Sequence, residues 1–191
     1  GLDEEDIVSQ FYRLGAQYYI LDVANGFNSS VEPMIRHIKS LDNTFAICGN
    51  VATNEGFAYL SDLGVDAIRV GIGNGSMCST SIMTGVGQGI VTALEECKSE
   101  KDKSGSKSLI IADGGVTNVG DIAKALGLGA DLVMMGKMFA GTKEAEGNVL
   151  KYDGTLYKAY RGSASFGVQA KHKENPNFIE GDETIVKYKG S

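Results

Sequence analysis

Short apolar runs alternate along the chain with segments whose apolar residues recur at helical spacing. The apolar runs, most of them β-branched, predict five strands at residues 18–21, 45–48, 67–70, 109–112 and 132–135. Apolar residues three and four positions apart predict helices at residues 4–14, 30–41, 54–63, 89–98 and 118–127. Strands that alternate with helices require a parallel sheet with helical crossovers. Because the strands are almost wholly apolar, we expect both faces of this sheet to be covered.

Other segments depart from this alternation. In the first helix, Ile7, Phe11 and Leu14 share one face, whereas residues 99–107 are polar and predict a solvated loop. After Gly147 the periodicity is lost. There, Tyr152-Asp-Gly-Thr-Leu156 predicts a hairpin with an Asp-Gly turn. Residues 166–180 predict a long mobile loop.

Every predicted strand ends in glycine or polar residues, and these ends share the carboxyl edge of the sheet. They are Asp22 and Asn25, Gly49 and Asn50, residues 73–78, residues 113–115, and Gly136. Barrels and doubly wound sheets both place their sites at this edge. A doubly wound sheet collects its ligand residues at one switch point, so signatures after all five strands favour a TIM (β/α)8 barrel.

A complete barrel has eight strands, so the five βα units make residues 1–191 a single, partial TIM-barrel domain. The two edges of a five-stranded sheet are open. We therefore expect that this span does not fold alone as a monomer.

Composition narrows the function classes. The 191 residues carry a formal net charge of −6 and contain no basic tract, which argues against nucleic-acid or membrane-surface binding. An anionic small ligand remains compatible, because backbone N–H groups can bind it. Three cysteines at unrelated spacings, with no signal peptide and no membrane-spanning apolar run, predict a reducing, cytoplasmic location. His37 and His172 show no metal-ligand spacing.

The stretch Gly71-Ile-Gly-Asn-Gly-Ser-Met-Cys-Ser-Thr80 is the candidate active site. Alternate glycines let the backbone turn sharply and approach a ligand. Ser76, Cys78 and Thr80 then offer two hydroxyls and a thiol, although a glycine-rich turn with a chance cysteine is the alternative. Cys48, within a strand, and Cys97, on an apolar helix face, are predicted to be buried and inert.

Two further strand ends suggest a nucleotide. Asp113 can accept hydrogen bonds from ribose hydroxyls while the Gly115 N–H meets a phosphate, but Asp113 can equally cap a helix. Gly136 and Lys137 lie where barrels form phosphate sites; the alternative is a left-handed turn glycine followed by a solvated lysine. Glu180 alone is most simply a solvated surface charge.

Taken in order, these motifs resemble the IMP dehydrogenase/GMP reductase family from about residue 14 to residue 189. The matching segments are residues 71–80, 112–115, 120–125, 129–136, 140–142 and 160–162. The resemblance implies a barrel of which strands four to eight are present here, so that the first three strands and a C-terminal segment lie outside this chain. It also implies a purine nucleoside monophosphate as ligand, a homotetramer, and a mobile active-site flap at residues 163–180.

The family's chemistry implies that Cys78 attacks C2 of the purine and forms a covalent adduct. In the reductase, ammonia leaves and NADPH delivers a hydride, converting GMP to IMP; in the dehydrogenase, NAD⁺ removes the hydride from IMP and water releases XMP. The implied catalytic residues are Cys78, Thr80 and Glu180, the last two as a proton relay.

The resemblance also implies the binding residues. Those for phosphate are Ser76, Gly115, Gly136 and Tyr160, with Lys137 beside them; those for ribose and base are Asp113, Gly162 and Ser163. The nicotinamide cofactor is assigned to Asp22, Asn25 and Asn50, and a K⁺ ion to the backbone carbonyls of Gly73, Gly75 and Cys78.

The two family members differ in finer signals. Leu21-Asp-Val-Ala-Asn-Gly26 and the short span from Gly162 to Glu180, which lacks an Arg-Tyr pair, resemble the reductase. Ala112, residues 140–142 with Glu144, and residues 160–162 are closer to the dehydrogenase, while Ser81 and Gln88-Gly89 depart from the family pattern. The balance favours GMP reductase, with IMP dehydrogenase as the alternative. A nucleotide-binding relative without turnover is a third hypothesis, against which the intact Cys78, Thr80 and Glu180 argue.

Overall fold

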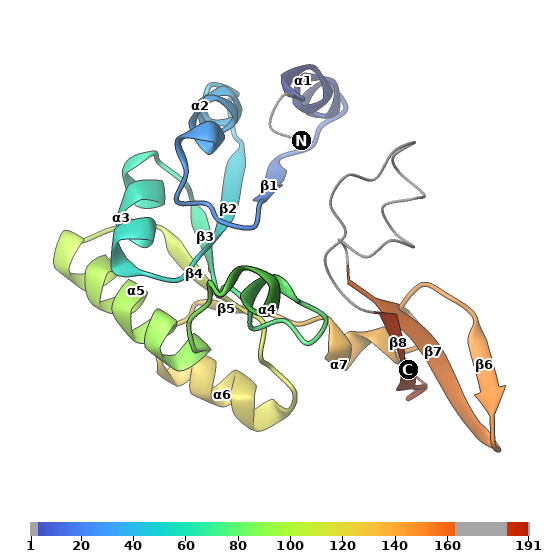
Figure 1. Cartoon of the computed structure of the whole chain (residues 1–191). Coiled ribbons are helices and arrows are strands. Elements are labelled where there is room, and N and C mark those ends of the chain that lie inside the picture. The colour runs from blue at the N-terminus through green and yellow to red at the C-terminus, as the bar shows by residue number, and fades with distance from the viewer. Residues whose placement is uncertain (1–3, 163–182, 191) are drawn as a thin grey trace.

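The computed structural model describes residues 4–162 and 183–190, and its centre is one parallel sheet. Five strands pair in the order β1-β2-β3-β4-β5, each beside its neighbour in the chain (Figure 1). They are β1 (Tyr18–Asp22), β2 (Phe45–Val51), β3 (Ala67–Val70), β4 (Leu109–Asp113) and β5 (Leu132–Met134). All five predicted strands are confirmed, and β2 continues three residues beyond the predicted end at residue 48.

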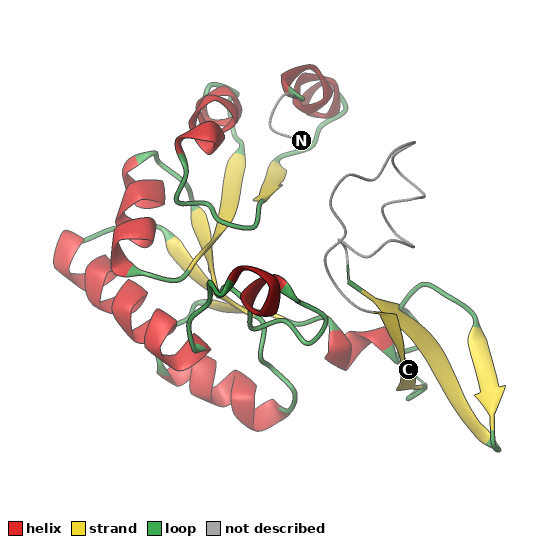
Figure 2. Ribbon diagram, in the orientation of Figure 1, coloured by secondary structure: helices red, strands yellow, loops and turns green. Residues whose placement is uncertain are grey.

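The helices between the strands lie together on the outer side of the curved sheet (Figure 2). They are α2 (Glu32–Lys39), preceded by the 3₁₀ turn η1 (Ser29–Val31), α3 (Asn54–Asp62), α5 (Ile90–Ser104) and α6 (Val119–Gly127). In a doubly wound sheet the strand order reverses and helices cover both faces. The sequential order seen here is that of consecutive units of a (β/α)8 barrel, so the α/β fold class is confirmed as part of a TIM barrel.

The main core lies between the sheet and the helices α3 and α5. Phe57 and Leu60 of α3 and Leu94 of α5 pack with Ile68 and Ile110 of the central strands, all at 0–1% exposure. The edge strands are less covered. On β1, Tyr18 and Ile20 are 71% and 53% exposed, and Leu132 on β5 is 52% exposed. Exposed apolar side chains on both edge strands, β1 and β5, are expected where a barrel is open.

The predicted loop at residues 99–107 is wrong over its first part, because α5 continues to Ser104. Lysine and glutamate are good helix formers, and ion pairs between Lys98 and Asp102 and between Glu100 and Lys103 join residues one turn apart. The helix ends only where Gly105 adopts a left-handed conformation. Polarity here marks the solvent face of a helix.

The helix α1 (Glu5–Arg13) forms as predicted, but its expected apolar face does not enter the core. Ile7, Phe11 and Leu14 are 44–83% exposed, and Val8 and Tyr12 make the packing contacts instead. Through these two residues the helix packs against a small cluster formed by β1, α2 and β2.

A separate antiparallel sheet lies beside α7 (Lys137–Ala140), a short helix that the sequence did not predict (Figure 1). Its strands are β6 (Val149–Tyr152), β7 (Thr155–Arg161) and β8 (Glu183–Lys187), in the order β6-β7-β8. The predicted hairpin is confirmed, with Asp153 and Gly154 both at positive φ in its turn. The strand β8 was not predicted, because it depends on pairing with β7 across a long stretch of chain.

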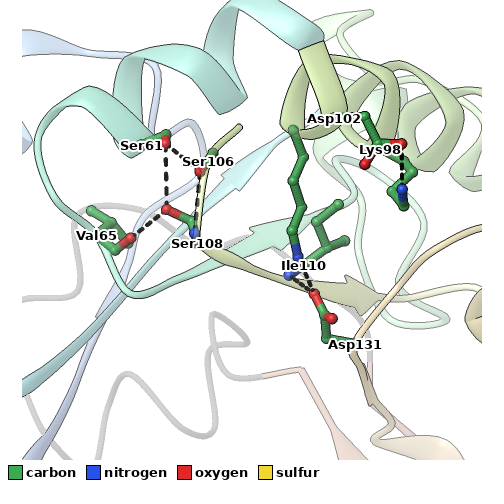
Figure 3. Close-up of polar contacts among 9 residues, drawn as sticks. Ser61, Val65, Lys98, Asp102, Ser106, Ser108, Ile110 and Asp131 are labelled. Atoms are coloured by element: carbon green, nitrogen blue, oxygen red, sulfur yellow. Dashed lines mark hydrogen bonds and ion pairs between the residues drawn. The ribbon is translucent and has the colours of Figure 1, made fainter. Parts of the chain in front are cut away.

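At the amino end of the sheet, Asp66 and Asp131 make equivalent clamps. Each directly precedes a strand and accepts the backbone N–H of the neighbouring strand, Ala46 for Asp66 and Ile110 for Asp131, at 2.7 and 2.8 Å. Each also accepts a lysine ammonium from the helix before that neighbouring strand, Lys39 in one case and Lys101 in the other. Figure 3 shows the second clamp, beside the linked hydroxyls of Ser61, Ser106 and Ser108. The repeated Gly-x-Asp of residues 64–66 and 129–131 is thus a strand-joining device.

We expect Asp131→Asn to destabilise the fold by about 1–2 kcal/mol, since a charged acceptor of two hydrogen bonds is lost. Burial acts to raise the pKa of Asp131, but the Lys101 ammonium and the Ile110 N–H outweigh it and lower the pKa from 3.8. Because the folded state binds the proton less readily than the unfolded state, the contribution is complete above about pH 5 and disappears as pH falls below about 4. Urea unfolding at pH 7 and pH 3 measures it. Asp102→Asn, in an exposed pair, is the control and should change stability by less than about 0.5 kcal/mol; equal losses in both variants would contradict the clamp.

Within residues 4–162 and 183–190, no helix combines the length and the apolar character that a membrane crossing requires.

Candidate active site

A cavity of about 640 Å³ opens at the carboxyl edge of the sheet, a size typical of small-molecule sites. Its walls come from the ends of all five parallel strands and from the end of β7. Among the predicted site residues, those that line it are Asp22, Asn50, Gly73, Gly75, Ser76, Cys78, Thr80, Asp113, Gly136, Tyr160 and Gly162. The structure therefore gathers most of the predicted site into one space.

Two glycine loops form the floor of this cavity by packing backbone to backbone. Gly71, at φ +136°, lies so close to the Asp113 carbonyl that a Cβ would collide with it. Gly114, at φ +87°, would bring a Cβ to 2.8 Å from the Gly75 nitrogen. Only glycine permits this conformation and this approach, which explains why both strand ends are glycine-rich.

Cys78 is the accessible thiol of the chain. It is exposed, whereas Cys48 and Cys97 are buried. Burial raises the pKa of Cys48 to about 11 and that of Cys97 to about 12, so both stay protonated at neutral pH. The predicted burial of these two cysteines is confirmed, and their inertness stays a prediction.

Thr80 lies beside Cys78, at the start of the short helix α4 (Thr80–Thr84), which the sequence did not predict. The Cys78 thiol donates to the Thr80 Oγ1 at 3.3 Å, and the Cys78 N–H donates to the Gly75 carbonyl at 3.0 Å. The tight turn therefore presents the sulfur and the hydroxyl together at the cavity wall.

Arg69 is the functional candidate that the sequence analysis missed. It lies on β3 with its side chain 10% exposed, and its two Nη atoms each hold a carboxylate at 2.7 Å: Asp22 at the end of β1 and Asp113 at the end of β4. Burial by itself lowers the pKa of Arg69, but the hydrogen bonds and charges of the two aspartates outweigh it, and the net pKa is raised. One permanent cation thus ties three strand ends together.

A signal for this network was present in the sequence. A basic residue within an otherwise apolar strand is costly to bury unless it is paired, and aspartates end two other strands at the same edge. Asn50 completes the group, because its Nδ2 donates to the Asp113 carboxylate at 2.8 Å and to the Gly71 carbonyl at 2.6 Å. In the described part of the chain, Asn50 Oδ1 and Arg69 Nε are buried without a hydrogen-bond partner.

The capping alternative for Asp113 is wrong, since Asn118 caps α6 through the Asp121 N–H. The turn alternative for Gly136 is also wrong, because its φ is −102°. Tyr160 packs directly over this glycine, where a Cβ would lie 2.8 Å from the Tyr160 hydroxyl oxygen. The same hydroxyl lies 3.4 Å from the Ser76 hydroxyl. Three of the residues assigned to phosphate are therefore neighbours.

The remaining predicted residues are placed differently or lie outside the described chain. Gly115 and Lys137 are not among the lining residues, although each follows one that is. Asn25 also lies outside the lining, and its Oδ1 accepts the Phe27 N–H within its own loop. Ser163, Glu180 and the predicted flap at 163–180 fall outside the described residues.

The K⁺ assignment to the carbonyls of Gly73, Gly75 and Cys78 stays a prediction. The Gly75 carbonyl already accepts the Cys78 N–H. Among residues 4–162 and 183–190, there is no group of three or more His, Cys, Asp or Glu side chains that could hold a metal ion.

The fold and the cavity together define an α/β-barrel protein with a cavity at the carboxyl ends of its strands. A family model described as "IMP dehydrogenase / GMP reductase domain" matches residues 2–191, and the chain belongs to this family of oxidoreductases.

Curated relatives carry both names of the family. The GMP reductase of Clostridium acetobutylicum is 44% identical over 193 residues, which cover 98% of this chain and 56% of the relative. That of Staphylococcus epidermidis is 44% identical over 178 residues, 92% of this chain and 52% of the relative. The inosine-5′-monophosphate dehydrogenase of Cryptosporidium parvum is 41% identical over 200 residues, 100% of this chain and 50% of the relative. The chain spans about half the length of these relatives.

Proposed function

We propose that this chain is the catalytic part of a GMP reductase, which converts GMP to IMP and ammonia at the expense of NADPH. The observation that carries the proposal is the exposed Cys78 beside Thr80 at the wall of the cavity. Relatives named GMP reductase are 43–44% identical to the chain. The preference for the reductase over the dehydrogenase rests on the reductase-like residues 21–26 and the short span from Gly162 to Glu180.

In this proposal, the Cys78 thiolate forms a bond to C2 of the guanine. The exocyclic C2–N bond then breaks, and the amine departs as ammonia after it gains a proton. Thr80 is assigned to pass this proton, and the 3.3 Å between its hydroxyl oxygen and the sulfur supports this role. Glu180 is assigned as its exchange partner on the family resemblance. When a hydride has reached C2, the C2–S bond breaks, IMP is released and the thiolate is restored.

Other residues hold the nucleotide in place. Asp113, fixed by Arg69 and Asn50, offers its carboxylate to the ribose hydroxyls. The neighbouring Ser76, Gly136 and Tyr160 offer hydroxyl and backbone donors to the phosphate. Donors of this kind let a chain of net charge −6 bind a dianion.

The residues at the ends of β1 and β2 suit a nicotinamide cofactor. Asp22 is 60% exposed at its side chain, and Asn50 Oδ1 is a buried acceptor with no partner in the described chain. A carboxylate and an amide oxygen accept hydrogen bonds from ribose hydroxyls or a carboxamide. When bound, the dihydronicotinamide supplies the hydride that C2 receives. The preference for NADPH, the K⁺ ion, the homotetramer and the cytoplasmic location belong to this proposal as expectations.

IMP dehydrogenase is the second candidate, because a relative of that name is 41% identical over the whole chain. The same Cys78 would then attack C2 of IMP, with NAD⁺ as hydride acceptor and water releasing XMP.

Absorbance at 340 nm separates the hypotheses on the intact protein. We expect NADPH to be consumed when GMP is added, with ammonia formed in equal amount. NADH formation with IMP would instead establish the dehydrogenase. If nucleotide binds but neither reaction occurs, the chain is a binding relative and the proposal fails.

A further inference from the structure

Lys158 carries a buried charge that the proposed chemistry does not use. It lies on β7, the central strand of the antiparallel sheet, and is 2% exposed. Lysine is almost never fully buried unless its charge is compensated. The compensation therefore has to come from neighbouring polar groups.

Backbone carbonyls provide this compensation. The ammonium donates to the carbonyls of Thr142 at 2.9 Å, of Lys143 at 3.5 Å, and of Ala145. An ammonium has three N–H donors and no acceptor, so the three carbonyls satisfy it. All these acceptors belong to the segment that follows α7. Within the described residues, no carboxylate pairs with Lys158. The ammonium thus occupies a carbonyl cage of the kind that a monovalent cation would fill.

The cage lies on the same side of β7 as Tyr160. Side chains two residues apart in a strand point to the same face, so Lys158 reaches the end of the segment that begins at Gly136, while Tyr160 packs over Gly136 itself. The far end of this segment is also held by the chain that follows β8, since the Lys143 N–H donates to the Gly190 carbonyl at 2.8 Å. Two contacts on one face therefore join β7 to the segment around α7.

We propose that Lys158 is a positioning residue for the phosphate subsite: its ammonium is a tethered cation that holds residues 142–145 against β7 and thereby sets the Tyr160 hydroxyl over Gly136. The proposal rests on the proposed function, because it takes the group bound there to be a nucleoside monophosphate.

The test compares GMP with guanosine by calorimetry on the intact protein. The wild type should bind GMP at least about 100-fold more tightly than guanosine, since each charge-assisted hydrogen bond to phosphate is worth about a factor of ten or more. In Lys158→Met, we expect GMP to bind about 10- to 100-fold more weakly, because the groups that contact the phosphate are misplaced. The affinity for guanosine should stay unchanged. KM for GMP should rise by the same factor while kcat at saturation stays within about twofold. Lys151→Met, an exposed lysine of β6, is the matched control and should leave both affinities unchanged.

A chemical-rescue measurement tests the tethered cation itself. In Lys158→Ala, n-propylammonium should restore GMP affinity and thermal stability, whereas tetramethylammonium, which has no N–H, should restore neither. Should Lys158→Met not fold, Lys158→Arg serves instead. The planar donors of arginine cannot converge on three carbonyls as one ammonium does, so this variant should show part of the same loss of GMP affinity.

The possible outcomes separate the two claims. Unchanged GMP affinity in the folded lysine variants, or equal losses for GMP and guanosine, would overturn the positioning role. If the wild type binds neither ligand, the proposed function fails and takes the phosphate-positioning role with it, while the amine rescue of thermal stability still decides whether the cage holds a cation.

Discussion

Replacing Cys78 by alanine should abolish turnover while GMP still binds. In the proposed mechanism the Cys78 sulfur is the protein atom that bonds to the purine, and removing a covalent nucleophile costs about 10⁴-fold or more in rate. Affinity should change by less than about threefold, since phosphate and ribose are assigned to other side chains. Steady-state rates at 340 nm and calorimetric titration with GMP measure the two effects separately.

The buried cysteines are the matched controls for this variant. Cys48→Ala and Cys97→Ala remove thiols that are 0% exposed and have pKa values of about 11 and 12. Each should retain turnover within about threefold. Each should lose only the small free energy of unfolding that comes from filling a core position. Undiminished turnover in Cys78→Ala would remove the nucleophile from the proposal, and with it the covalent route.

Replacing Arg69 by leucine should produce the largest loss of stability, about 3–5 kcal/mol at pH 7, because a buried charge pair is broken from one side. The carboxylates of Asp22 and Asp113 would then face each other without their shared cation. Because the Asp113 side chain is 19% exposed, little solvent is available to stabilise its charge in place of the arginine. GMP affinity should fall as well, since the carboxylate assigned to ribose loses its orientation. Urea unfolding of the intact protein gives the first quantity and calorimetry the second.

Comparison with an exposed ion pair identifies the cause of that loss. Arg36→Leu, in an exposed pair with Glu32, should cost less than about 1 kcal/mol. An Arg69 variant as stable as the Arg36 variant would show that the network does not hold the strand ends together.

The Arg69 network and the Lys158 cage support different residues that line one cavity. Arg69 orders the carboxylate and amide groups at the ends of β1, β2 and β4, where ribose and cofactor are assigned. Lys158 holds the segment after α7 against β7, the strand that also carries Tyr160, and phosphate is assigned to Tyr160 and Gly136. Both use a buried cation to hold backbone or carboxylate oxygens, so the geometry of the site should be set before any ligand arrives.

The order and type of the parallel strands, the glycine-rich strand ends and the family could all be predicted from the amino-acid sequence. These features are local: apolar periodicity decides strand or helix within a few residues, and glycine permits the positive φ that the chain adopts at Gly71 and Gly114. Cys78 and Thr80 could be paired in advance because only one residue separates them.

Only the tertiary structure decided which polar groups meet. Arg69 joins aspartates 47 residues before it and 44 residues after it (69 − 22 and 113 − 69), and Lys158 meets carbonyls of a segment 13 to 16 residues earlier. Such partners are chosen by the strand order and by the need to compensate a buried charge, which neighbouring residues do not reveal. For the same reason β8 was missed, since its hydrogen bonds come from β7 and not from any pattern of its own. The extension of α5 was missed because its polar residues face solvent, and the ion pairs that support it become evident only on the helix.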